Sequence, residues 1–167
     1  MNKKYELTDE TINISGHILH RIRAIKPFGN VKLGDLGGFI ESEKNLEQEG
    51  SCWIYGDAQV YEGARVSNNA QISGNAIVSG NARVYGDAQV SNNALVSSHS
   101  KIYGDAQLCE EVWASGDADI SGDTQLFGRA RIFGKTKLDS GIWNKTIEVD
   151  DRYYLISTTL KKILMEW

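Results

Sequence analysis

The sequence predicts an all-β fold in which short strands stack as a parallel β-helix, and three observations carry that prediction. A branched aliphatic residue returns every six positions from Ile54 to Leu138, interrupted only at Ala114. A small residue, most often Ala, follows four positions after each aliphatic residue. Gly is the commonest residue two positions after it, with Asn as the substitute at two such positions, and both tolerate positive φ.

Each six-residue unit therefore reads as a short strand followed by a sharp turn. Because residues two apart in a strand share a face, Ala76 and Val78 point inward while Ile77 points outward. Three units close one triangular coil of about 18 residues, and successive coils stack in parallel. Residues 54–143 supply five regular coils. Within them Val112 fills a small slot and Ala114 the next large one, an exchange of volume that a close-packed interior requires.

A degenerate coil is expected over residues 36–53, where the repeat is imperfect. Running the register backward gives four apolar inward positions, two turns and two poor inward residues, in the order Leu36, Ile40, Leu46 and Cys52, then Gly38 and Gly50, then Ser42 and Gln48. The β-helix is therefore predicted to span residues 36–143.

Residues 1–35 and 144–167 are expected to cap the two open ends of the stack, which would otherwise expose strand edges and core. Residues 11–26 read as a β-hairpin that turns at Ser15-Gly16. The C-terminal segment reads as two short strands and a short helix, whose apolar residues share one face: Leu160, Ile163, Leu164 and Trp167. That face is expected to close the last coil, with a contact to another subunit or partner as the alternative.

The run of I/V-x-G-D/N-A-x units resembles the hexapeptide-repeat, left-handed β-helix superfamily, in which many acyltransferases are found. The resemblance implies that the coils are left-handed. The segment from Phe28 to Ser42, followed by Asn45-Leu46 and Cys52-Trp53-Ile54, resembles a narrower group of mostly uncharacterised repeat proteins, often found in phages, prophages and gut bacteria. Together the resemblances cover about residues 5–143.

Outward residues stack at a period of 18 and form three columns on three faces. The first column consists of glutamines flanked by two tryptophans: Gln71, Gln89, Gln107 and Gln125, with Trp53 and Trp143. Stacked amides can hydrogen-bond between coils, so this face is expected to be structural.

The second column is apolar at its centre and runs Gln59, Ile77, Leu95, Trp113, Arg131. A contiguous apolar patch centred on Trp is typical of an interface. We expect Ile77, Leu95 and Trp113 to mediate a homo-oligomer, a dimer or trimer, since prisms of the resembled superfamily commonly trimerise. A foreign protein partner, or cover by a terminal segment, is the alternative.

The third column is mostly basic and runs Arg65, Arg83, Lys101, Asp119, Lys137. Tyr85 and Tyr103 lie beside it, and basic groups next to tyrosines can stack on bases or clamp phosphates. Acidic turn residues are expected to neutralise this strip: Asp87, Asp105, Asp117 and Asp123. We therefore expect a solvated face with salt bridges between coils, with an acidic protein or anionic ligand as the alternative.

Catalytic residues are sparse in the repeat. The resemblance to acyltransferases implies a histidine base near a loop that interrupts the coils, yet residues 54–143 contain no insertion. His17 and His20 lie in the hairpin, so His99, at an ordinary turn, is the candidate base. Cys109 is expected to point outward beside acidic residues that raise its pKa, and Cys52 inward. No metal and no cofactor are expected.

The chain of 167 residues carries a net charge of -4, which gives no electrostatic footprint for nucleic acid or an anionic membrane. No signal peptide or apolar membrane span is recognised, so a bacterial cytoplasm is the expected location. The sequence favours a non-catalytic protein-binding scaffold, in its concrete form a phage or prophage protein that inhibits or modulates a bacterial defence or regulatory protein. An acyltransferase acting at a subunit interface and a purely structural protein are the alternatives.

Overall fold

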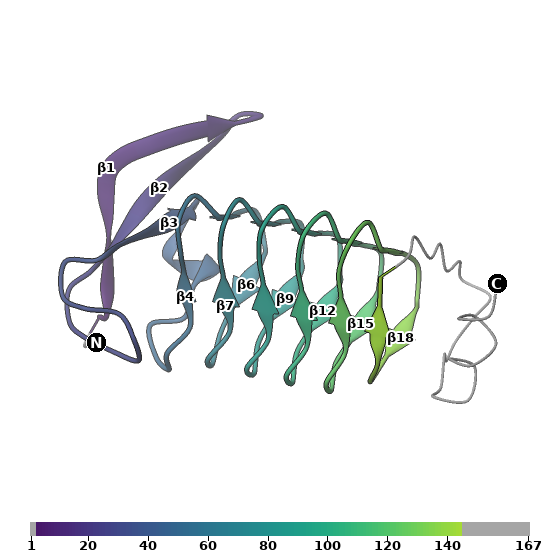
Figure 1. The fold of residues 1–167 in the computed structure, drawn as a ribbon. Helices are drawn as coiled ribbons and strands as arrows, with labels where there is room; N and C mark the ends of the chain where they lie inside the picture. Colours follow the sequence, from purple (N-terminus) through teal and green to yellow (C-terminus); the bar gives the residue numbers. More distant parts are fainter. Residues whose placement is uncertain (1–2, 145–167) are drawn as a thin grey trace, which may run out of the picture.

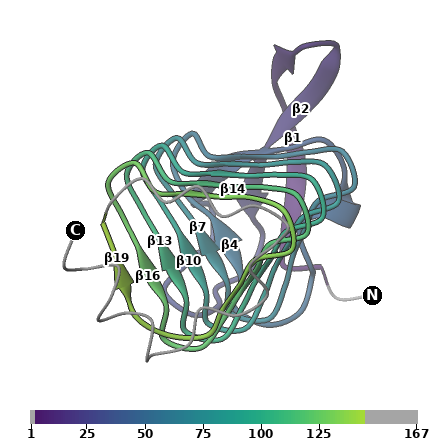
Figure 2. The same cartoon turned by 90° about the vertical axis from the view of Figure 1, so that its right-hand side faces the viewer.

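The computed structural model describes residues 3–144 and confirms an all-β, parallel solenoid of about six coils (Figure 1). Seen nearly along the axis, the coils superpose on one another (Figure 2). The left-handed sense of the coils stays a prediction that rests on the family resemblance. Within the described part of the chain, no helix is both long and apolar enough to span a bilayer.

Three sheets form the sides of the solenoid. Sheet I has eight strands: β1 (Tyr5–Ile14), β2 (His17–Ala24), β3 (Leu36–Ile40), β5 (Gln59–Val60), β8 (Ile77–Val78), β11 (Leu95–Val96), β14 (Trp113–Ala114) and β17 (Arg131–Ile132). Sheet II has six: β4 (Trp53–Ile54), β7 (Gln71–Ile72), β10 (Gln89–Val90), β13 (Gln107–Leu108), β16 (Gln125–Leu126) and β19 (Ile142–Trp143). Sheet III has five: β6 (Arg65–Val66), β9 (Arg83–Val84), β12 (Lys101–Ile102), β15 (Asp119–Ile120) and β18 (Lys137–Leu138). A 3-10 helix, η1 (Glu43–Asn45), packs beside β6.

The core is a single column of inward side chains enclosed by the three sheets. Aliphatic residues and alanines from every coil are buried in it, including Val112 and Ala114 with no exposed surface. Three hydroxyl residues also fit the small slot: Ser100, Thr124 and Thr136. Each donates its hydroxyl to a backbone carbonyl three residues earlier, as Ser100 does to Ser97 at 2.8 Å, so no polar group is left unpaired there.

The turns explain why Gly recurs at one position of the repeat. Gly74 has φ of 69°, and a Cβ atom there would lie 2.9 Å from the Cα atom of Asn92 in the next coil. Close stacking of the turns and the positive φ of this turn residue therefore both favour Gly. Asn68 and Asn92 adopt the same conformation, with φ of 58° and 59°, in line with the tolerance of Asn for it.

The first coil departs from the predicted register. Ile40 pairs with Val60 and Leu46 with Val66, each two positions further than the regular period, whereas Ile54 pairs with Ile72. The turn between Leu46 and Ile54 therefore holds two extra residues.

This insertion corrects several inward assignments. Ile40 and Leu46 occupy the large slots that the regular register gave to Ser42 and Gln48, and both are fully buried. Leu36 is 57% exposed rather than inward, and Gly38 lies within β3 rather than in a turn. The predictions of a buried Cys52 and a turn at Gly50 are confirmed.

The last described coil is one residue short. Gln125 pairs with Ile142 and Leu126 with Trp143, so Trp143 points into the core and is 5% exposed. Ile142 takes the outward position and is 63% exposed. The expectation that Trp143 flanks the glutamine column on the outside was therefore wrong.

The hairpin of β1 and β2 turns at Ser15 and Gly16, with φ of 51° and 95°, as the sequence predicts. β2 also pairs with β3, so the hairpin continues sheet I beyond the first coil. Its far end projects away from the coils (Figures 1 and 2). Its base covers the first coil, where Tyr5 packs edge-on against Trp53 with ring centroids 6.2 Å apart. Trp53 thus has the predicted register but is buried. The predicted C-terminal helix lies outside the described residues.

Candidate functional site

The glutamine column on sheet II is in register as predicted, with Gln89 between Gln71 and Gln107. The expectation that their amides hydrogen-bond between coils was wrong, because no hydrogen bond joins these glutamines in the described part of the chain. Side-chain bonds between coils occur at the corners instead, where Asn69 Nδ2 donates to Asp87 Oδ1 at 3.0 Å and Asn75 to Asn93 at 3.3 Å. The short Asn side chain loses less rotamer entropy than Gln when it is held in such a ladder.

The apolar column on sheet I forms a continuous face across three coils. Leu95 pairs in register with Ile77 on one side and with Trp113 on the other. Ile77 and Leu95 are half-buried, and Trp113 is 36% exposed. The Arg131 guanidinium lies 5.8 Å from the Trp113 ring centroid.

Phe133 also belongs to this face, although it lies outside the predicted column. Its ring meets Trp113 edge-on, with centroids 5.2 Å apart and an interplanar angle of 74°. It stands two positions after Arg131, and that spacing, which puts both side chains on one face, was the available signal. The four C-terminal residues proposed for the same contact surface lie outside the described residues: Leu160, Ile163, Leu164 and Trp167.

The basic column on sheet III is also in register, with Arg83 between Arg65 and Lys101. All three side chains are exposed. The salt bridges expected between coils do not form among residues 3–144, because none of the ion pairs there includes these three cations. Lys101 is the register partner of Asp119 in the sheet, but the two side chains form no ion pair. The corner residue Asp87 accepts from Asn69 instead of from the strip.

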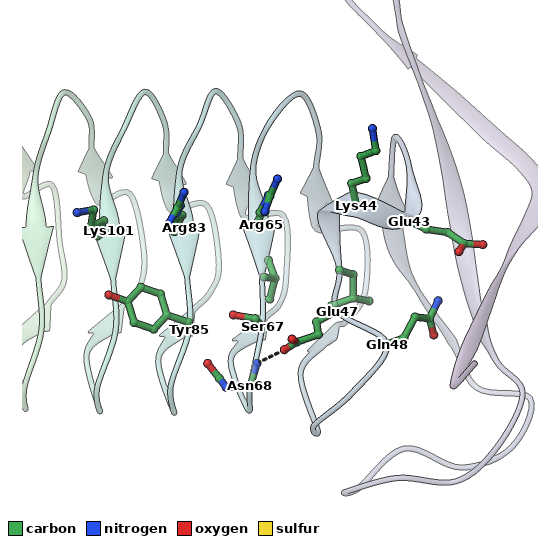
Figure 3. Close-up of a pocket in the computed structure, with 12 residues that line it drawn as sticks. Glu43, Lys44, Glu47, Gln48, Arg65, Ser67, Asn68, Arg83, Tyr85 and Lys101 are labelled. Carbon is green, nitrogen blue, oxygen red and sulfur yellow. Dashed lines mark hydrogen bonds between the residues drawn. The ribbon is translucent and has the colours of Figure 1, made fainter. Parts of the chain in front are cut away.

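A groove of about 540 Å³ opens where this column meets the first coil (Figure 3). It is lined by Glu43, Lys44, Leu46, Glu47, Gln48, Arg65, Val66, Ser67, Asn68, Arg83, Tyr85 and Lys101. The two carboxylates of this lining have other partners. Glu47 Oε2 accepts the Asn68 backbone N–H at 2.9 Å, and Glu43 pairs with Lys3 at 2.6 Å. The four cations have no ionic partner among the described residues, so the groove is a local basic site on an acidic chain.

Two tyrosines stack beside the cations. The Tyr85 and Tyr103 rings are 4.9 Å apart and 1° from parallel, and of the two only Tyr85 lines the groove. Burial raises the pKa of Tyr85, and the neighbouring Tyr103 and Asp119 raise it further. Tyr85 is therefore a neutral phenol at physiological pH, and its ring is available as a flat apolar surface.

The candidate base of the acyltransferase alternative, His99, is exposed at the corner between sheets I and III. Its Nε2 atom lies 3.4 Å from Asn81 Nδ2, and no described carboxylate or nucleophile is hydrogen-bonded to it. Residues 3–144 contain no group of three side chains placed to hold a metal ion.

Cys109 is half-buried on the outer surface, with Sγ 3.6 Å from the Leu126 carbonyl. Burial and the nearby Glu110 raise its pKa, in the predicted direction. Its thiol is therefore poorly ionised at neutral pH, and nothing in this arrangement activates it as a nucleophile.

The matches to known proteins lie within the repeat. Residues 70–86 and 78–91 match the family described as the YdcK beta solenoid repeat. The uncharacterized acetyltransferase YdcK of Escherichia coli (strain K12) is 39% identical over 61 residues. That match covers 32% of this chain and 19% of the relative, so the chain corresponds to about a fifth of the relative's length. Both matches fit a hexapeptide-repeat β-helix superfamily.

Proposed function

We propose that this chain is a non-catalytic scaffold that binds another protein through the outer face of sheet I. The supporting observation is the run of three apolar side chains in register that ends on Trp113, with Arg131 over its ring. Trp and Arg are enriched among residues that carry most of the energy of an interface. A face built on stacked strands is already ordered, so binding there costs little additional conformational entropy.

The proposed biological form is a phage- or prophage-encoded protein that acts in the cytoplasm of a bacterial host and inhibits or modulates a defence or regulatory protein. Its support is the resemblance of residues 28–42, 45–46 and 52–54 to the group of repeat proteins that are often found in phages, prophages and gut bacteria. A second copy of the chain is the other partner that suits this face, because an isologous dimer or a trimer buries the same patch on every subunit.

An acyltransferase is the second candidate, and the name of the YdcK relative favours it. In this chain His99 would be the base, yet it lacks a carboxylate partner among the described residues to orient its ring. A base of this kind would need a second subunit to complete its site, so this alternative also depends on self-association.

Affinity capture from a bacterial host extract tests the scaffold proposal. We expect the wild-type chain to recover one host protein in stoichiometric amount, or to form a dimer or trimer by light scattering. Trp113→Asp should abolish either interaction. Gln107→Asp is the matched control, because it places the same charge on an exposed strand position of sheet II. The captured protein must bind again when purified. A chain that is strictly monomeric and captures nothing, or whose interaction survives Trp113→Asp, contradicts the proposal.

Turnover of acetyl-CoA separates the two candidates. We expect no transfer to small amine or hydroxyl acceptors and no hydrolysis above the uncatalysed rate. Turnover that disappears in His99→Ala, in a protein that still unfolds cooperatively, would replace the scaffold proposal with the acyltransferase.

A further inference from the structure

The aromatic stack on sheet III stops at the groove. Tyr103, in the following coil, covers one face of Tyr85. The preceding coil carries Ser67 at the equivalent position. The register is continuous there, since Ser67 N–H donates to the Val84 carbonyl as Tyr85 N–H does to Ile102. The other face of Tyr85 therefore looks over Ser67, and both residues line the groove. Coils rise by about 4.8 Å, so the absent ring leaves a space about one aromatic ring thick.

The row of cations runs parallel to this stack. Arg65, Arg83 and Lys101 each stand two residues before the member of the stack in their own coil, so both rows lie on the outer face of sheet III. Figure 3 shows the three cations, with Ser67 and Tyr85 beside them. Two residues of extended chain separate the two rows by about 6.7 Å. Lys44 adds a fourth cation at the first coil. The groove thus places unpaired positive charge beside a ring-sized space.

We propose that this groove binds a free nucleoside phosphate. The base stacks on Tyr85 in the space above Ser67, and the phosphates lie along Arg65 and Arg83, with Lys101 and Lys44 nearby. The ribose spans the gap between the two rows, as it separates base from phosphate in every nucleotide. Asn68 Nδ2, which donates to no other described residue, is available for an acceptor on the base edge. The groove volume lies in the range of small-ligand sites.

The other end of the stack shows why the site is at this end. The far face of Tyr103 also looks over a serine, Ser121, at the equivalent position of the following coil. There the row beside the stack carries Asp119, which repels phosphate. At that end Asp119 interrupts the row between Lys101 and Lys137, whereas the row beside Tyr85 and Ser67 consists of Arg83 and Arg65.

The site takes a single nucleotide rather than a strand. The groove is walled on its first-coil side by residues 46–48, and on the opposite side the stack of Tyr85 and Tyr103 is closed. One base fills the space between them. This site lies on a different sheet from the proposed protein-binding face, so either proposal can fail without the other.

Isothermal titration of the whole chain with ATP tests the site, with tripolyphosphate and adenosine as the two halves of the ligand. We expect ATP to bind more tightly than either half, and its affinity to fall as salt is raised. Tyr85→Ala should weaken ATP binding roughly 5- to 150-fold, since that is the range for loss of one base–aromatic stack. Arg83→Gln should weaken it about tenfold or more, because a charge-assisted contact is lost.

Ser67→Tyr is the sharpest variant, because it completes the stack with a protein ring and fills the proposed base site. We expect this variant to fold and to lose ATP binding while it still binds tripolyphosphate. Ser121→Tyr is its matched control, since it extends the same stack at the other end and should leave ATP binding unchanged.

Three results would overturn the proposal. The first is an affinity for tripolyphosphate equal to that for ATP, which would show a phosphate site without a base site. The second is unchanged ATP binding in a folded Ser67→Tyr protein. The third is tighter binding of a single-stranded oligonucleotide than of ATP, which would assign the groove to nucleic acid.

Discussion

At the scale of single residues, volume is the strictest constraint on this chain. Val112 and Ala114 are both fully buried in one coil, with their sizes exchanged relative to the repeat. Val112→Ala leaves a cavity and should cost about 2 kcal/mol in the free energy of unfolding. Ala114→Val overpacks the core and should cost about 1–3 kcal/mol.

The double variant restores the pattern of the other coils. We therefore expect its loss of unfolding free energy to be smaller than the sum of the two single losses by about 1 kcal/mol or more. Denaturant unfolding of all four proteins gives the coupling. Additive costs would mean that the two side chains do not share space.

The two cysteines differ in burial, and their reactivity should differ accordingly. Cys52 is fully buried, and desolvation raises its pKa although Lys4 Nζ lies 3.3 Å from its sulfur. We expect iodoacetamide at pH 8 to label Cys109 slowly and Cys52 only after denaturation. Mass spectrometry of the alkylated protein measures both. Labelling of Cys52 in the native protein at the rate of a free thiol would show that the base of the hairpin opens readily.

At the scale of elements, the hairpin is held to the first coil by a titratable pair. His17 Nδ1 lies 2.9 Å from Glu41 Oε1, and the His17 ring packs beside Tyr61 with centroids 5.3 Å apart. The hydrogen bond with Glu41 raises the pKa of His17, and the same bond lowers the pKa of Glu41. Because the pKa of His17 is raised in the folded protein, protonated His17 stabilises the contact fully at pH values below its ordinary pKa of 6.5. That stabilisation is lost as the pH rises through the pKa of His17 in the folded protein.

Because the pKa of Glu41 is lowered in the folded protein, its carboxylate stabilises the contact fully at pH values above its ordinary pKa of 4.5. That stabilisation is lost as the pH falls through the pKa of Glu41 in the folded protein. The contact is therefore strongest between these two ordinary values. An NMR titration should give His17 a pKa above 6.5, and Glu41→Gln should bring it back toward that value. A His17 pKa at or below 6.5 in the wild type would contradict the pairing.

The sequence predicts elements well where the repeat is regular and less well where the coil length changes. From residue 54 to residue 138 the six-residue period fixes which side chains point inward, because a slip of one residue would reverse every one of them. Ile40 was correctly predicted to point inward, but its slot was misassigned because one loop gained two residues. Trp143 was wrongly predicted to point outward because another loop lost one residue. A turn absorbs such a change without altering the apolar spacing on either side, so the period alone does not locate it.

The candidate sites show the same division. The columns on all three faces follow from the period, and so does the neighbourhood of Arg83 and Tyr85. The absence of ion pairs between that column and the other described residues does not follow, because it depends on where corner side chains such as Asp87 find partners. The wall at residues 46–48 likewise depends on the irregular first coil. Sequence thus placed the cations, and the structure was needed to see that they face a groove.

At the scale of the whole molecule, a stack of equivalent coils predicts an unusual response to deletion. Each coil contacts only its neighbours, so removing one complete coil should leave the rest able to close. Deleting residues 104–121 removes one strand from each sheet, β13, β14 and β15, and joins Tyr103 to the turn glycine Gly122. We expect this protein to keep its β-type circular dichroism and a cooperative thermal transition.

The matched control is the shorter deletion of residues 104–112, which joins Tyr103 to Trp113. It removes half as many residues but puts strand residues into a turn and breaks the six-residue period, so we expect it to be the less stable of the two. The longer deletion also removes Trp113 while it leaves the groove-lining residues intact. It should therefore lose the protein partner and keep ATP binding. Equal stability of the two deletions would show that the coils do not behave as interchangeable units, and joint loss of both activities would show that the two faces are not independent.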